Sequence, residues 1–275
     1  MKNIKNTGYS DFIGETLEEV SGIARASFGK VTGIIKKEDY NQVLTKTDLE
    51  IGERIIKNIL ARFATYNIID EEAGVIDKKS DYTWVIDPID GTSNYAYGVP
   101  LYGIMMGLLE KDKPICGGVA LPSFSEIYLA EKNKGAYCNG EKLSVTVDDN
   151  LNHALVAYGI DGYRTNPELT RKEGRLLSEI ILNIRNLRSS NSAFDWMMVA
   201  QGKYGAFLSL AGKIWDNVAP QIIIEEAGGK YTDFFGKKID YTEPLKKAKD
   251  GFTFLAAAPG LQAKILDIVK RKFKR

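Results

Sequence analysis

A change of hydrophobic period near residue 67 constrains the fold of this chain more than any other feature. From there, short apolar or alternating runs are separated by Gly, Pro and Asn, which is typical of successive strands joined by tight turns. The runs are "NIID", "YTWVID", "LYGIMMGLLE", "ICGGVALP", "SEIYLAE" and "GAYCNG". They predict a large antiparallel sheet before residue 147.

Two helices are expected ahead of this sheet. Ser10 stands where it could cap a helix whose apolar residues recur at helical spacing and which ends near Gly29. Thr47 and Glu50 have the spacing of a capping box at the start of a second helix. The stretch "GKVTGIIKKEDYNQV" between them lacks a helical period, so we expect a ribbon or a mobile loop there.

Strands and helices alternate in the second half of the chain. Strands are expected in "ALVAYGI", "YGAFLSL" and "FTFLAAA", and helices at residues 167–184, across "WDNVAPQIIIEEAGG" and at the carboxyl terminus. This order predicts a mixed α/β (α+β) chain with sheets layered between helices. We expect an N-terminal block over residues 1–147 and a C-terminal block over residues 148–275, packed tightly as one unit.

The charge balance and the histidine count exclude several functional classes. Of 275 residues, 37 are Lys or Arg and 36 are Asp or Glu, which argues against a nucleic-acid groove or a membrane-surface footprint. The apolar runs are too short to span a membrane, the first residues lack a secretion signal, and Cys116 and Cys138 have no metal-type spacing. These features predict a soluble, cytoplasmic protein. The single histidine, His153, argues against polyhistidine zinc sites and Ser-His-Asp catalysis.

The segment "WVIDPIDGTSNY" places two acids, Asp87 and Asp90, directly after a buried strand. A carboxylate in that position needs solvent, a basic partner or a metal ion, because burying it unpaired is costly. Pro88 stiffens the expected turn, and Gly91 allows the backbone to approach a ligand closely. The two acids can converge around such a turn, although Asp-Pro and Asp-Gly are also common in plain surface turns.

Two further apolar runs end in acids. "NIIDEEAG" ends in Asp70, Glu71 and Glu72, and "KIWDNVAP" places Asp216 after Trp215 at an expected helix start. Three such runs are hard to explain as helix caps alone, so they predict a shared metal site. Clustered oxygen ligands suit Mg²⁺.

Four segments, in order, resemble the signatures of one known family. "WVIDPIDGTSNY" resembles the Asp-Pro-Ile/Leu-Asp-Gly-Thr signature of the inositol monophosphatase-like, Mg²⁺-dependent phosphatases, and "WDNVAPQIIIEEAGG" is similar to their second signature. "GVALPSFSEIYLAEKNKGAYCNG" resembles the family's central strands, and "QVLTKTD" its Val-Thr-x-x-Asp segment. The resemblance extends over nearly the whole chain. It implies a five-layered α-β-α-β-α sandwich of the sugar phosphatase type.

The resemblance also implies a set of metal ligands for two or three Mg²⁺ ions, with Mn²⁺ as an alternative. Asp87 would bridge two ions, and the carbonyl of Ile89 would complete one of the two sites. Asp90 and Asp216 would hold the other ion. Glu71 would bind the first ion, position water and touch a weak third ion.

The catalytic groups implied by the resemblance are Glu71, Thr92 and Asp48. Thr92 and Asp48 would orient and deprotonate the attacking water, and the N–H groups of Gly91 and Thr92 would face the phosphate. Asp48 also has an alternative reading as a favourable acid in the first turn of a helix. Two metal ions and a water suffice for phosphate-monoester hydrolysis, which fits a chain with one histidine.

Substrate contacts are expected mainly from the second half. Asn191 and Ser192, in "SNSA", occupy the family's substrate loop, and Ser209 stands where inositol monophosphatases carry a glutamate for ring hydroxyls. The remaining substrate contacts expected from the family are Asp90, Gly91, Thr92 and Asp216. Lys37 is placed either as the family's loop lysine or as a solvated surface lysine.

The predicted activity is hydrolysis of a small polyol or sugar phosphate, with inositol-1-phosphate as the first expectation. Fructose-1,6-bisphosphatase activity, alone or as a second activity, is the nearest alternative, and 3′-phosphoadenosine 5′-phosphate is a more distant one. A catalytically silent regulatory relative and a Mg²⁺-buffering protein are alternatives of other classes. The resemblance further implies a homodimer.

Overall fold

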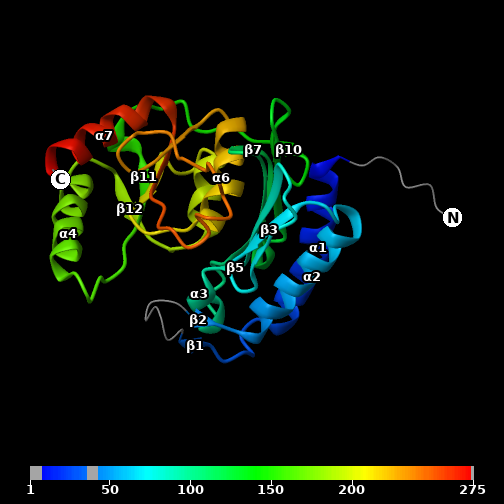
Figure 1. Ribbon diagram of the computed structural model, residues 1–275. Helices are drawn as coiled ribbons and strands as arrows, with labels where there is room; N and C mark the ends of the chain where they lie inside the picture. The colour runs from blue at the N-terminus through cyan, green and yellow to red at the C-terminus, as the bar shows by residue number, and fades with distance from the viewer. Residues whose placement is uncertain (1–7, 36–42, 274–275) are drawn as a thin grey trace.

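Two sheets and three layers of helices alternate across the molecule (Figure 1). The computed structural model describes residues 8–35 and 43–273. Helices α1 and α2 cover the outer face of the larger sheet, α5 and α6 lie between the sheets, and α4 and α7 lie on the far side of the smaller sheet. These helices are α1 (Tyr9–Ser27), α2 (Lys46–Arg62), α4 (Pro167–Ile181), α5 (Ala193–Ala200), α6 (Ile214–Glu226) and α7 (Pro259–Lys272). The expected five-layered α-β-α-β-α sandwich is confirmed.

The larger sheet has eight strands in the order β10-β9-β8-β7-β6-β5-β3-β4. They are β3 (Asn67–Asp70), β4 (Gly74–Ile76), β5 (Tyr82–Asp90), β6 (Gly103–Glu110), β7 (Lys113–Leu121), β8 (Glu126–Glu131), β9 (Gly135–Cys138) and β10 (Glu141–Lys142). Neighbouring strands are antiparallel with one exception, since β3 and β5 run parallel. The expectation of a fully antiparallel sheet is therefore wrong at this pair. Strand β4 pairs with the outer side of β3 at the sheet edge, so β5, the next strand in the chain, lies on the inner side of β3 and runs parallel to it.

The smaller sheet has five strands in the order β12-β11-β13-β15-β14. They are β11 (Leu155–Gly159), β12 (Asn186–Arg188), β13 (Ala206–Ser209), β14 (Lys230–Thr232) and β15 (Phe254–Ala257). Strand β11 is parallel to both β12 and β13, so these three strands end at the same edge. Two short strands, β1 (Ile34–Ile35) and β2 (Val43–Leu44), form the described part of the expected ribbon, whereas Lys37 lies outside the described residues.

Both N-terminal helices begin at residues other than those expected. The cap of α1 is Gly8, whose N–H donates to Oδ2 of Asp11 (3.2 Å), and Ser10 lies inside the helix. Helix α2 is capped by Thr45 and Asp48, which have the same three-residue spacing as the expected pair. The expected caps, Ser10 and Thr47 with Glu50, are therefore wrong by two residues, because the extended backbone that a cap requires lies further upstream.

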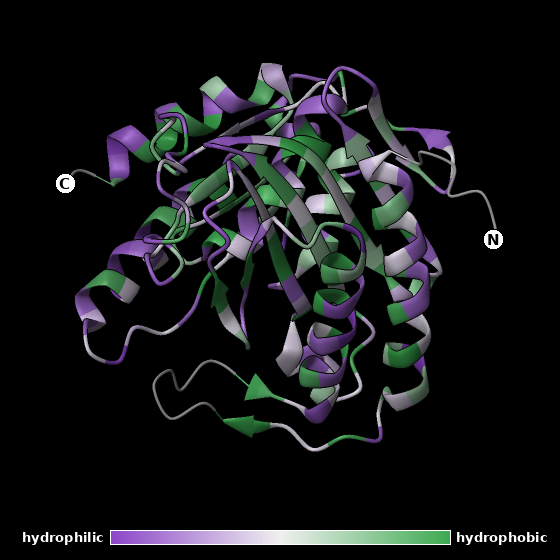
Figure 2. Ribbon diagram, turned by 45° about the vertical axis from the view of Figure 1, so that its right-hand side comes forward, coloured by the Kyte–Doolittle hydropathy of each residue, from purple (hydrophilic) through white to green (hydrophobic). Residues whose placement is uncertain are grey.

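Helix α6 lies closely against the larger sheet because two strand glycines leave room for it. A Cβ at Gly107 would lie 2.6 Å from Cγ1 of Val218, and a Cβ at Gly117 would lie 2.9 Å from Cα of Ala219. Figure 2 shows mainly hydrophobic residues along the central strands and a mixture of hydrophobic and hydrophilic residues along the covering helices. No described helix combines the length and the apolar character needed to cross a bilayer.

Candidate active site

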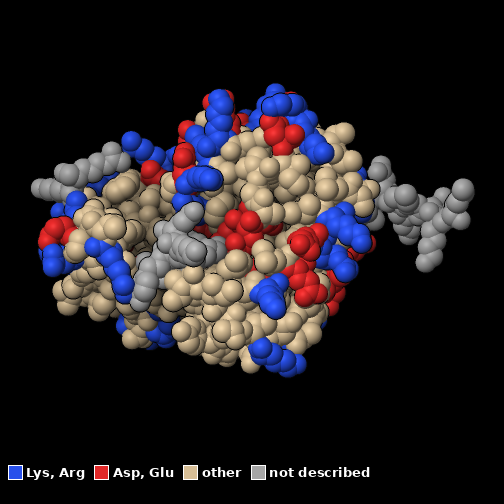
Figure 3. Space-filling model, turned by 60° about the horizontal axis from the view of Figure 1, so that its bottom comes forward, with Lys and Arg blue, Asp and Glu red and all other residues tan. Residues whose placement is uncertain are grey.

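A cavity of about 560 Å³ opens between the two sheets. It is bordered by the ends of β5, β11 and β13, by the loop before α5 and by the start of α6. Figure 3 shows acidic side chains gathered in a hollow of this face. The acidic residues that line the cavity, among those described, are Glu71, Asp87, Asp90, Asp161 and Asp216.

Glu71 and Asp87 come together because β3 and β5 run parallel. The register pairs Asp70 with Ile86, so the residues that follow them leave the same edge of the sheet side by side. The N–H of Glu71 donates to the carbonyl of Ile86 (3.2 Å). Asp70 stabilises the turn after β3, where its Oδ1 accepts hydrogen bonds from two backbone N–H groups.

A β-bulge directs Asp87 and Asp90 to the same side of the sheet. In a regular strand, residues three apart point to opposite faces. Asp87 pairs with Met105 and Asp90 with Gly103, so β5 has one more residue than β6 across this interval, which reverses the alternation. Pro88 is tolerated there because a bulge leaves one residue out of the hydrogen-bonded ladder. The strand therefore continues to Asp90, in place of the turn expected around the two acids.

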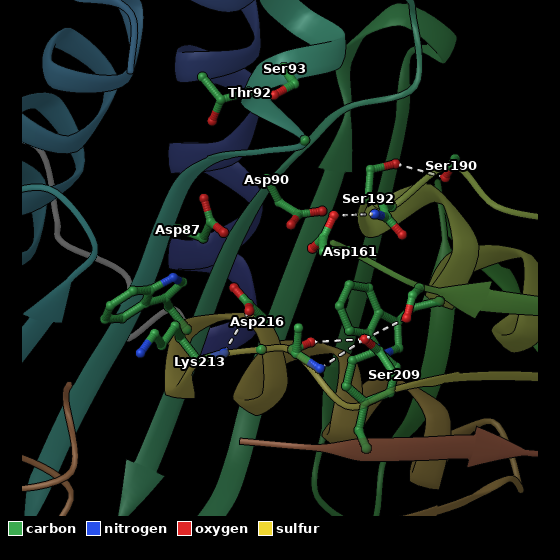
Figure 4. A pocket seen from close by; sticks show the side chains of 18 of the residues that line it. Asp87, Asp90, Thr92, Ser93, Asp161, Ser190, Ser192, Ser209, Lys213 and Asp216 are labelled. Carbon is green, nitrogen blue, oxygen red and sulfur yellow. Dashed lines mark hydrogen bonds between the residues drawn. The ribbon is translucent and has the colours of Figure 1, made fainter. Parts of the chain in front are cut away.

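Asp87, Asp90 and Asp216 form one carboxylate cluster. Each offers an oxygen, and the three oxygens lie within 4.8 Å of one another. Asp216 lies in the first turn of α6, where its Oδ2 accepts the N–H of Lys213 (2.7 Å) and where the helix dipole favours an anion. Asp90 accepts the N–H of Ala193 at the start of α5. Figure 4 shows the three side chains pointing into the cavity.

Burial and mutual repulsion raise the pKa of two of these acids. The pKa of Asp87 lies well above its usual range, first because the side chain is buried and then because Glu71 and Asp90 are close. The pKa of Asp90 is raised by burial and by Asp216, although the N–H of Ala193 opposes this. Oδ1 of Asp87 is buried and has no hydrogen-bond partner among the described residues. A partly buried cluster of oxygen donors in which the buried Asp87 has this unpaired oxygen fits a hard divalent cation such as Mg²⁺.

Thr92 connects the carboxylate cluster to Asp48. Oγ1 of Thr92 lies 2.7 Å from the carbonyl oxygen of Ile89 and 3.2 Å from Oδ1 of Asp48. Asp48 is 1% exposed and lies behind Thr92, and its Oδ2 accepts the N–H of Thr45 (2.8 Å) as the acid of the capping box. Burial makes the largest contribution to raising the pKa of Asp48 to about 6. Asp48 therefore reaches the cavity by a hydrogen bond through Thr92, and its charge adds to the raised pKa of Asp87.

The predicted substrate loop packs against Gly91. This glycine has a φ of 79°, and a Cβ on it would lie 2.8 Å from Cβ of Ser192. Asn94 is hydrogen-bonded to the loop, because its Nδ2 donates to the carbonyl of Ser190 (2.9 Å). Oδ2 of Asp195 accepts the N–H of the same residue, Ser190 (2.9 Å). Gly91 is thus required for the approach of the loop, in addition to any approach of a ligand.

Asn191, Ser192 and Ser209 all line the cavity. Ser209 is 4% exposed, and its Oγ lies 3.0 Å from the carbonyl oxygen of Gly159 and accepts the N–H of Ala211 (3.1 Å). The hydroxyl is therefore held by the backbone, and the expected contact of Ser209 with the substrate stays a prediction.

Three residues of this region were not anticipated from the sequence. Asp161 follows the apolar run "ALVAYGI", which is the same signal that pointed to Asp87. Asp195 follows Ser192 at the spacing of a capping box. Asn94 has no comparable signal, because its role depends on a loop 96 residues further along the chain.

Comparison with known proteins identifies the class to which this fold and site belong. The model of the inositol monophosphatase family matches residues 10–270. A fructose-1,6-bisphosphatase/inositol-1-monophosphatase of Aquifex aeolicus is 33% identical over 228 residues, which cover 78% of this chain and 84% of that protein. Inositol monophosphatase 1 of Bos taurus is 30% identical over 226 residues, covering 79% and 80%. The structure of the Thermotoga maritima IMPase has a TM-score of 0.84 at 27% identity and covers 96% of this chain and 97% of that chain.

The chain belongs to the inositol monophosphatase family. It is a phosphoric monoester hydrolase that acts on a small phosphorylated substrate. The family is metal-dependent, and the carboxylate cluster at the end of β5 could bind a metal ion.

Proposed function

We propose that this protein hydrolyses a small polyol or sugar phosphate monoester in the presence of Mg²⁺, with inositol-1-phosphate as the first substrate to test. The observation that carries the proposal is the cluster of Asp87, Asp90 and Asp216 beside an open cavity, where one oxygen of Asp87 has no hydrogen-bond partner in the described part of the chain. Such a cluster is costly to bury without a cation.

The cluster supplies the residues that would hold the metal ions. Asp87, Asp90 and Asp216 would provide carboxylate oxygens, Glu71 would add a carboxylate from the neighbouring strand, and Ile89 would add its carbonyl oxygen. Bound Mg²⁺ would supply an acidified water and neutralise charge on the phosphate and the leaving oxygen. Mn²⁺, which prefers the same oxygen donors, is the alternative ion.

Thr92 and Asp48 would orient the attacking water. The hydroxyl of Thr92 borders the cavity, and its hydrogen can be donated to either Ile89 or Asp48. When that hydrogen is directed to Asp48, Oγ1 could accept a proton from a water while its own hydrogen passes to the Asp48 carboxylate. Asp48 is thus a positioning residue, whereas Thr92 is the group that would touch the water. The backbone N–H groups of Gly91 and Thr92 would face the phosphate oxygens.

Fructose-1,6-bisphosphate is the second candidate substrate. It is favoured by the names of the Aquifex aeolicus and Thermotoga maritima relatives, which are 33% and 32% identical to this chain. The experiment is phosphate release from inositol-1-phosphate, fructose-1,6-bisphosphate, glycerol-2-phosphate and 3′-phosphoadenosine 5′-phosphate, each with and without Mg²⁺ or Mn²⁺. We expect metal-dependent release, fastest from inositol-1-phosphate. Faster release from fructose-1,6-bisphosphate would reassign the main substrate, and no metal-dependent release from any compound would contradict the proposal.

The proposal includes a cytoplasmic homodimer. This part rests on the composition of the chain and on the family resemblance of its motifs. Sedimentation velocity at micromolar concentration would test the oligomeric state. A species with the mass of one 30.6 kDa chain would contradict the dimer.

A further inference from the structure

One wall of the cavity is built from the ends of β11 and β13. These strands are parallel, and Gly159 pairs with Ser209 at their last position. The segments that follow the two strands therefore both leave the sheet at this wall. Ligands of open α/β sheets are commonly bound at the carboxyl ends of such strands. Because the hydroxyl of Ser209 is held by the backbone, it has at most one acceptor position left for a ligand.

Asp161 supplies a carboxylate at the same wall. It follows the end of β11, is half-buried and lines the cavity (Figure 4). Nδ2 of Asn191, from the substrate loop, lies 3.3 Å from Oδ1 of Asp161 and 3.5 Å from the carbonyl oxygen of Ile160. Asn191 has a φ of 51°, which asparagine adopts more readily than most residues. A carboxylate has about four acceptor sites, so a bond from Asn191 is compatible with bonds from a ligand.

The charge that the described residues give this wall favours a neutral group on the ligand. Lys213 is the one basic side chain among the described residues that line the cavity, and its Nζ lies 2.9 Å from the carbonyl oxygen of Lys249. A second phosphate beside Asp161 would meet a like charge in a partly desolvated site. Hydroxyl groups would instead donate hydrogen bonds to the carboxylate, and such charge-assisted bonds are stronger than neutral ones.

We propose that Asp161 determines substrate specificity by accepting hydrogen bonds from adjacent hydroxyls of the substrate's alcohol part. This inference rests on the proposed phosphatase function. It assigns the hydroxyl-binding carboxylate to the segment after β11, not to the end of β13, where Ser209 stands.

The test compares inositol-1-phosphate with phenyl phosphate, whose alcohol part has no further hydroxyl. The quantity is the ratio of kcat/KM for the two substrates in Asp161→Asn, Asp161→Ala and the unaltered enzyme. We expect the ratio to fall about 10- to 100-fold in Asp161→Asn, since a hydrogen bond to a charged group is lost, and at least as far in Asp161→Ala. The loss should arise mainly from a higher KM for inositol-1-phosphate.

The matched control is Asp267→Asn, which removes an exposed carboxylate on α7, outside the cavity. It should retain the ratio of the unaltered enzyme. A ratio that is unchanged in both Asp161 variants would overturn the inference while leaving the proposed function intact. An unaltered enzyme without metal-dependent activity on either substrate would instead contradict the proposed function.

Discussion

At the scale of single residues, buried carboxylates occur in two different settings. Asp87 is buried beside other acids at the cavity, where a cation can compensate the charge. Glu173, on α4, is fully buried away from the cavity, and its Oε2 has no hydrogen-bond partner among the described residues. The hydroxyl of Tyr158 donates to its Oε1 (3.2 Å). The first setting is typical of a metal site, and the second favours the neutral form of the acid by raising its pKa.

Replacing Glu173 should change how stability depends on pH. Burial raises the pKa of Glu173 from 4.5 to about 7. The unfolded chain therefore ionises this group at lower pH than the folded chain does, and folding loses stability as pH rises from 4.5 to about 7. We compare the free energy of unfolding of Glu173→Gln with that of the unaltered protein. This difference should shift by roughly 2–3 kcal/mol in favour of the variant when the pH is raised from 4 to 8. Urea unfolding at both pH values measures this difference, and a pH-independent difference would contradict the assignment.

The hydroxyl of Thr92 should be needed for turnover but not for metal binding. It borders the cavity, whereas the carboxylate cluster is formed by other side chains. We expect Thr92→Val to lower kcat about 100-fold or more, in the range of a lost proton acceptor, and Thr92→Ser to stay within about tenfold of the unaltered enzyme. Both variants should keep the stabilisation by Mg²⁺. A Thr92→Val enzyme with unaltered kcat would remove Thr92 from the mechanism.

At the scale of elements, sequence patterns predicted the longer strands and most helices, but not the short strands β4, β10, β12 and β14 or how the strands pair. The runs "NIID" and "YTWVID" became β3 and β5, yet their parallel pairing and the bulge at Pro88 were not anticipated. Both features depend on which strands become neighbours, which local periodicity does not encode. The acids were identified because they end apolar runs. The way in which a bulge turns Asp90 toward Asp87 required the structure.

The close packing of α6 against the larger sheet can be tested by adding a methyl group at Gly117. A Cβ at Gly117 would lie 2.6 Å from Cγ2 of Ile222 and 2.9 Å from Cα of Ala219, so Gly117→Ala must displace the helix that carries Asp216. We expect a loss of about 1–3 kcal/mol of stability together with weaker Mg²⁺ affinity. Thermal unfolding and Mg²⁺ titration measure the two effects.

The control for this change is Gly22→Ala in α1. Gly22 is exposed, and nothing lies within 4 Å of a Cβ at that position. Alanine there should stabilise the helix by about 0.5–1 kcal/mol without changing Mg²⁺ affinity. Unaltered stability and Mg²⁺ affinity in Gly117→Ala would show that the helix does not depend on this glycine.

At the scale of the whole molecule, the site is shared between the two sheets and the helix layer between them. Asp87 and Asp90 come from the larger sheet, Asp216 from α6, and Asp161 and Ser209 from the edge of the smaller sheet. The layered architecture and the metal cluster could be anticipated from four ordered motifs. The wall at the ends of β11 and β13 could not be anticipated. The hydrogen bonds of Asp161, Asn94 and Ser209 there join segments that are distant in the sequence.

Metal binding at this shared site should stabilise the folded protein as a whole. A ligand that binds only the folded state at 100 times its Kd adds about 2.7 kcal/mol. We expect a higher Tm with Mg²⁺ than with EDTA. In EDTA, Asp90→Asn should be at least as stable as the unaltered protein, because a repulsive buried charge is removed. Differential scanning calorimetry measures both comparisons, and an Asp90→Asn protein that keeps the full Mg²⁺ effect would place the metal elsewhere.

We infer that the carboxylate cluster at the end of β5 makes this chain a metal-dependent phosphatase. The most direct test is a Mg²⁺ titration of phosphate release from inositol-1-phosphate by the unaltered enzyme and by Asp90→Asn. We predict release that rises with Mg²⁺ and saturates in the unaltered enzyme, and a loss of at least about 100-fold in Asp90→Asn. Release that does not depend on a divalent cation, or that continues unaltered in Asp90→Asn, would contradict the claim.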